Sequence, residues 1–60
     1  MYLRLLSKGI NRTYSIINSK TRSEIGYIFI KNHYIDKIQF KYNTFSFEEW
    51  QKIIKLIEVI

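Results

Sequence analysis

The sequence predicts an α+β fold in which a four-stranded antiparallel β-sheet is followed by one C-terminal amphipathic helix. Apolar, β-branched and aromatic residues alternate with polar ones in four segments, near 2–7, 12–18, 25–31 and 34–42. Residues 46 to about 59 instead carry apolar side chains at helical spacing. No proline and only two glycines interrupt the 60 residues, so residues 1–60 are expected to form a single domain.

The connections between the strands follow from their polar composition. Residues 7–11 are suited to a hairpin loop, and residues 18–24 to a longer polar loop. Asn32 and His33 predict a two-residue turn, because asparagine tolerates positive φ.

The fourth strand has the strictest alternation. Its two faces are predicted to carry Ile38, Phe40 and Tyr42 on one side and Lys37, Gln39 and Lys41 on the other. In the third strand the same rule groups Ile25, Tyr27 and Phe29 on one face and Ile28 and Ile30 on the other. Both faces of the third strand are therefore apolar, so it is either buried on both sides or presents its aromatic face to a ligand.

The helix has the strongest local signal in the chain. Ser46 and Glu49 have the spacing of a capping box, in which each side chain accepts a hydrogen bond from the backbone amide of the other residue. Phe45 and Trp50 occupy the positions of a hydrophobic staple. A helix is therefore predicted to begin at Ser46.

The apolar arc of this helix is wider than one sheet can cover. Trp50, Ile54 and Ile57 are expected to pack on the strands, while Ile53, Leu56 and Ile60 face elsewhere. A domain this small buries only roughly 60 % of the surface that its unfolded chain exposes, so its stability alone is expected to be low. Without cysteine it has no disulfides, and oligomerisation is therefore the expected source of further stability. The predicted homodimer interface consists of Ile53, Leu56, Ile57 and Ile60. The alternative is a thick core with a frayed helix end.

The sequence has few of the residues that catalysis and metal binding require. The one histidine, His33, falls in a turn without an obvious carboxylate partner, and no cysteine is present. Two glycines cannot build a glycine-rich phosphate loop. We therefore expect a protein that is not an enzyme, with no catalytic residues, no metal site and no cofactor.

The positive charge lies in the strand region. Residues 1–47 contain eight basic and two acidic residues, whereas residues 48–60 contain two basic and three acidic ones. Cations that follow phosphates and rings on which bases stack are what single-stranded nucleic acid requires. The candidate binding residues are Arg12, Tyr14, Lys20, Arg22, Tyr27, Lys31, Tyr34, Lys37 and Lys41. Taken singly, each of them is an ordinary strand or surface residue; their concentration in one region favours binding.

Other ligands and settings are disfavoured. The helix is acidic at its start, which would repel duplex phosphates from a recognition helix, and its basic face is too weak for a membrane surface. The apolar run in residues 2–6 is too short for a signal peptide or a membrane span. We therefore expect an intracellular, cytoplasmic protein, in the host cell if it is encoded by a phage.

Two segments resemble the positive cofactor four family of transcriptional coactivators and its bacterial and phage relatives. The family ending Gly-Ile-Ser-Leu-Thr-Leu-Glu-Gln-Trp is similar to residues 42–50, Tyr-Asn-Thr-Phe-Ser-Phe-Glu-Glu-Trp, with Tyr42 in place of the glycine. Its strand opening Gly-Lys-x-Arg-Tyr-Val-Ser-Val is similar to residues 9–16, Gly-Ile-Asn-Arg-Thr-Tyr-Ser-Ile. The resemblance implies a homodimer that binds single-stranded DNA across curved strands, with the helices paired at the two-fold axis. It also implies that Arg12 and Lys41 contact phosphates.

Three functions therefore remain at this stage. The first is sequence-tolerant binding of single-stranded nucleic acid by a homodimer, and the sequence does not distinguish DNA from RNA as the ligand. The second is a small phage or mobile-element protein that binds and inhibits a host nuclease or defence factor. The third is an RNA- or ribosome-associated protein.

Overall fold

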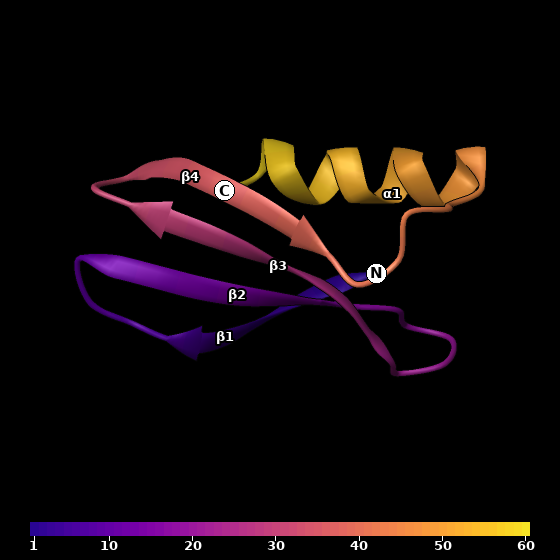
Figure 1. The fold of residues 1–60 in the computed structure, drawn as a ribbon, viewed down its shortest axis with the longest axis horizontal. Coiled ribbons are helices and arrows are strands. Elements are labelled where there is room, and N and C mark those ends of the chain that lie inside the picture. Colours follow the sequence, from indigo (N-terminus) through magenta and orange to yellow (C-terminus); the bar gives the residue numbers. More distant parts are fainter.

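The computed structural model describes all 60 residues and confirms the α+β class. Its elements are β1 (Tyr2–Ser7), β2 (Asn11–Ile17), β3 (Glu24–Lys31), β4 (Tyr34–Phe40) and α1 (Phe47–Glu58). The strands form one antiparallel sheet in the order β1-β2-β3-β4 (Figure 1). Each predicted element is therefore present, with ends that differ from the predicted ones by at most two residues.

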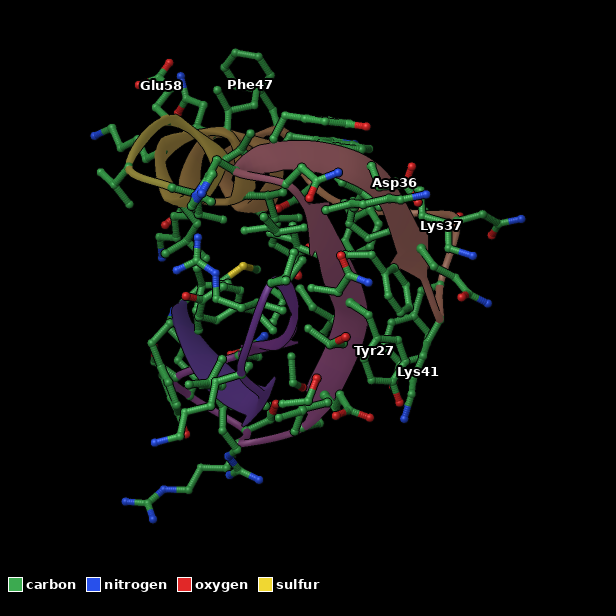
Figure 2. The ribbon with its side chains drawn as sticks, turned by 90° about the vertical axis from the view of Figure 1, so that its left-hand side faces the viewer. Tyr27, Asp36, Lys37, Lys41, Phe47 and Glu58 are labelled. Atoms are coloured by element: carbon green, nitrogen blue, oxygen red, sulfur yellow. The ribbon has the colours of Figure 1, made fainter.

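The helix returns over the sheet after β4 and covers one of its two faces. Figure 1 shows α1 beside β4 and running in the opposite direction. Figure 2 shows that α1 lies on one side of the sheet only. We call the uncovered side the outer face.

The turn between β3 and β4 has the predicted two-residue form. Asn32 and His33 both have positive φ, 51° and 72°, and the flanking residues Lys31 and Tyr34 pair directly. Positive φ at both central residues is the mark of a type I′ turn, whose twist matches that of the flanking strands. This turn fixes the register of the β3–β4 hairpin.

The core consists of isoleucines from the sheet and one from the helix. The buried cluster contains Ile16, Ile25, Ile28, Ile30 and Ile53. It lies between α1 and the sheet, and Met1, Leu3, Ile35 and Ile38 are among the residues that pack against its rim.

The prediction that Ile25 shares a face with Tyr27 and Phe29 is wrong. Ile16 pairs with Gly26 and Ile17 pairs with Glu24, so Ile25 is the extra residue of a β-bulge. A bulge re-aims the side chain of its strand, which here moves Ile25 into the core. Gly26 beside it allows β4 to approach closely, because a Cβ at this position would lie 2.5 Å from the Gln39 carbonyl oxygen.

The start of α1 confirms the predicted cap. The Glu49 amide donates to Ser46 Oγ over 3.1 Å, and the Ser46 amide donates to Glu49 Oε1 over 2.9 Å. The rings of Phe45 and Trp50 pack edge to face with centroids 5.2 Å apart, and Phe40 of β4 joins both rings. The staple therefore also anchors the helix to the end of β4.

The predicted orientation of the helix is partly wrong. Ile53, placed by its spacing in a dimer interface, is 0 % exposed and belongs to the core of the protomer, and Leu56 and Ile57 are half-buried against the same core. Ile54, expected to pack on the strands, is 49 % exposed. Ile53 and Ile54 are about 100° apart around a helix, so only one of them can face the sheet. Of the four residues predicted to form the dimer interface, only Ile60 has an exposed side chain.

Substitution of the two neighbouring isoleucines tests this orientation. Ile53→Ala is expected to lower the free energy of unfolding by about 2–5 kcal/mol, because it leaves a cavity in the core. Ile54→Ala is the matched control, with an expected loss of about 1 kcal/mol or less at protein concentrations low enough to keep the chain monomeric, because the side chain is half exposed in one protomer. Urea unfolding followed by circular dichroism measures both, and Ile53→Val replaces Ile53→Ala if that variant does not fold. Equal losses at the two positions would contradict the orientation.

Candidate nucleic-acid interface

The outer face of the sheet gathers polar and aromatic side chains from all four strands. Residues that pair directly in an antiparallel sheet have their side chains on the same face. The register therefore places on the outer face Arg4 of β1, Asn11, Thr13 and Ser15 of β2, Tyr27, Phe29 and Lys31 of β3, and Tyr34, Lys37 and Gln39 of β4. None of these residues belongs to the isoleucine core or packs against it.

Two aromatic rings of β3 each lie beneath a lysine, one from β4 and one from the residue directly after β4. Lys37 Nζ is 4.9 Å from the centroid of the Phe29 ring, and Lys41 Nζ is 5.8 Å from that of the Tyr27 ring. The two rings are themselves 6.2 Å apart. Figure 2 shows Tyr27, Lys37 and Lys41 on the side of the sheet away from α1. The alternation of the two strands has thus built a row of cation–π pairs on the outer face.

The carboxylate of Glu24 organises one end of this row. Lys41 Nζ lies 2.7 Å from Glu24 Oε1, Tyr27 Oη donates to the same oxygen over 2.5 Å, and Ser15 Oγ donates to Oε2 over 2.5 Å. The hydrogen bond from Lys41, followed by those from Ser15 and Tyr27, lowers the pKa of Glu24 to about 2. The same contacts raise the pKa of Tyr27 and that of Lys41. Lys41 is therefore held in an ion pair.

The lysines at the other end of the row have no acidic partner. The two salt bridges of the protein are Lys41–Glu24 and Lys52–Glu48. Lys31 and Lys37 belong to neither, and both are exposed. The outer face therefore carries two lysines that no carboxylate pairs with, and Arg4 of β1, which pairs with Ser15 in the register, is a third exposed cation outside both salt bridges.

The structure brings together only part of the predicted binding set. Tyr27, Lys31, Tyr34 and Lys37 lie on the outer face, as the register shows, and Lys41 adjoins them through its contacts with Tyr27 and Glu24.

The other four predicted residues are not part of this row, although Arg12 lines a hollow together with Phe29, Lys31 and Lys37. Arg12 and Tyr14 pair with Ile30 and Ile28, so they face the helix side, where Tyr14 packs against the core. Lys20 and Arg22 belong to the loop between β2 and β3, at the opposite end of β3 from Lys31, and Lys20 borders the first turn of α1. One continuous surface of all nine residues does not form, because Arg12 and Tyr14 alternate to the helix side and the loop residues fall outside the ladder.

Phe29 lies on the outer face beside Tyr27, and the predicted binding set omitted it. Its alternation with Tyr27 in β3 was the available signal, since two residues apart in a strand means the same face. Asp36 was also omitted, and no pattern in the sequence marked it, because it owes its position to a bulge in β4.

The structure contains no group of three or more His, Asp or Glu side chains arranged to hold a metal ion. No helix combines the length and the apolar character needed to cross a membrane. Comparisons with protein-family models, with curated proteins and with solved structures find no match to this chain.

The Glu24 contacts predict a pH dependence of stability. Because the folded-state pKa of about 2 lies below the ordinary value of 4.5, the network stabilises the fold fully above pH 4.5 and is lost as the pH falls through about 2. The free energy of unfolding is measured against pH for the native protein and for Glu24→Gln. The difference between them is expected to shrink in that window. A difference that stays constant from neutral to acid pH would contradict the assignment.

Proposed function

We propose that this protein binds single-stranded nucleic acid on the outer face of its sheet. The observation that carries the proposal is the pair of rings, Tyr27 and Phe29, each beneath a lysine on the face that the helix leaves uncovered. A base that stacks on a ring takes the place of the lysine stem, and the lysine then reaches the adjacent phosphate. Each stacked base contributes about 1–3 kcal/mol whatever its identity.

Charge favours the same assignment. The chain has a net charge of +5, and α1 begins with the acidic residues Glu48 and Glu49. Phosphates are therefore attracted to the sheet and repelled from the start of the helix, which disfavours insertion of α1 into a duplex groove. Lys41 attracts phosphate less strongly than an unpaired lysine at the same position would, because it is already in an ion pair with Glu24.

Homodimer formation is the second part of the proposal. Phe47 is 78 % exposed and Ile54 is 49 % exposed, and their spacing of seven residues places them on the same face of α1. Exposed apolar side chains at this density favour contact with another protein surface. A second copy is the partner that the size of the domain recommends.

Binding to a different protein is the alternative function. An open groove of about 560 Å³ lies at the end of β4 and is lined by Phe40, Lys41, Tyr42, Asn43, Phe45 and Trp50. Tyr42 is 52 % exposed there, so the groove offers an aromatic wall to a partner such as a host nuclease or defence protein. Capture of one stoichiometric host protein, unaffected by nuclease treatment, favours this alternative.

Substitutions on the outer face test the binding proposal. Phe29→Ala is expected to weaken binding to a fluorescent oligothymidylate by about 1–3 kcal/mol, through loss of one stacking platform. Lys37→Ala is expected to weaken binding and to reduce the slope of log K against log salt by about 0.7, the value for one phosphate contact on a single strand. Fluorescence anisotropy at several salt concentrations measures both.

Two helix substitutions are the matched controls. Phe47→Ala and Lys55→Ala remove the same types of side chain from exposed positions on α1 and are expected to leave affinity and slope nearly unchanged, at protein concentrations where light scattering gives the variant and the native protein the same mass. Absence of binding by the native protein at low salt would end the proposal. So would equal losses in the outer-face and helix variants.

The mass of the native protein in solution tests the dimer. Light scattering after size exclusion is expected to give twice the 7.3 kDa of one chain. Ile54→Lys is expected to return the mass to that of a monomer while the circular dichroism spectrum is kept, because the side chain is half exposed in one protomer. A native mass of one chain at high concentration would refute self-association.

A further inference from the structure

A small hollow lies on the outer face near the β3–β4 turn. It has a volume of about 190 Å³ and brings together side chains of β2, β3 and β4. Phe29 contributes an aromatic wall, Lys31 and Lys37 contribute the cations without ion-pair partners, and Asn11 and Asp36 contribute hydrogen-bonding groups. The hollow therefore combines the elements of a site for one nucleotide.

Asp36 reaches this hollow because of an irregularity in β4. Ile30 pairs with Ile35 and Phe29 pairs with Lys37, which leaves Asp36 as the unpaired residue of a bulge. Figure 2 shows Asp36 beside Lys37, on the side of the sheet away from α1. Its carboxylate makes none of the salt bridges and side-chain hydrogen bonds of the free protein. An acceptor without a partner thus stands next to an aromatic wall.

The chemistry of this acceptor distinguishes the four bases. An ionised carboxylate only accepts hydrogen bonds, and its two oxygens match two adjacent N–H donors. Guanine has such a pair on its Watson–Crick edge, at N1 and the exocyclic N2. Adenine and cytosine place an acceptor nitrogen beside their amino group, and thymine and uracil flank their one N–H with two carbonyl oxygens. Reading of this edge is the usual route to specificity on unpaired nucleotides.

We propose that the hollow is a guanine-selective subsite of the interface. The base stacks on Phe29, its Watson–Crick edge donates to Asp36, and Lys31 and Lys37 hold the flanking phosphates. This inference rests on the proposed function and adds a base preference to it. Binding elsewhere on the outer face stays independent of sequence, because stacking on Tyr27 requires only a flat base.

Four short oligothymidylates test the preference, with dG, dA, dC or dT at the central position. The native protein is expected to bind the dG oligonucleotide about fivefold more tightly than the other three, which is the lower end of the discrimination by one bidentate contact. Asp36→Asn is expected to abolish that ratio without weakening binding to the all-dT strand, because the substitution removes a negative charge. Glu58→Gln removes one carboxylate from α1 and is expected to preserve the ratio.

The outcomes separate this inference from the proposed function. If all four strands bind with equal affinity, or if Asp36→Asn keeps the preference for dG, the subsite is refuted while single-strand binding stands. If no strand binds at low salt, both are refuted. The comparison of the four strands needs only the native protein, so it holds even if a variant fails to fold.

Discussion

A single helix of twelve residues can cover only one face of a four-stranded sheet, and the rest of the molecule follows from this constraint. The isoleucines of β2 and β3 gather under Ile53 on the covered face. The opposite face has no second layer, and there the rings of Phe29 and Tyr27 lie beneath the side chains of Lys37 and Lys41. Such cover stabilises the free protein through cation–π contact and burial of the lysine stems, and a base can replace it.

The outer face is divided by its acidic residues. At one end Glu24 binds Ser15, Tyr27 and Lys41 together, which fixes the ring and cancels the charge of the lysine. At the other end Lys31 and Lys37 have no such partner, and Asp36 lies beside them without a hydrogen bond from another side chain. The first end is cross-linked by these contacts, and the second is the part of the face for which ligand binding is proposed.

Patterns of nearby residues were enough to predict the elements of the fold. The alternation in β4, the Asn32-His33 turn and the capping box at Ser46 all depend on short-range geometry, and all are confirmed. The faces of Ile25 and Asp36 could not be predicted, because each follows from a bulge set by pairing with another strand. The predicted positions of Ile53 and Ile54 were exchanged because the apolar arc of the helix is wide and does not specify which of its residues meet the sheet. The predicted binding set is divided between the two faces in the structure, because Arg12 and Tyr14 pair with core residues of β3 and so alternate to the helix side. Phe29 was predictable from its spacing to Tyr27.

The central claim is that the face without a helix is the ligand-binding face. Mapping of NMR chemical shifts during titration with an unlabelled oligothymidylate tests it most directly, since each side chain reports its own environment. Binding on the outer face is expected to give the largest changes at Phe29 and Lys37, with upfield movement of the Phe29 ring protons, and to leave Phe47 and Glu58 on α1 unchanged. Largest changes on α1, or in the loop of residues 18–23, would contradict it.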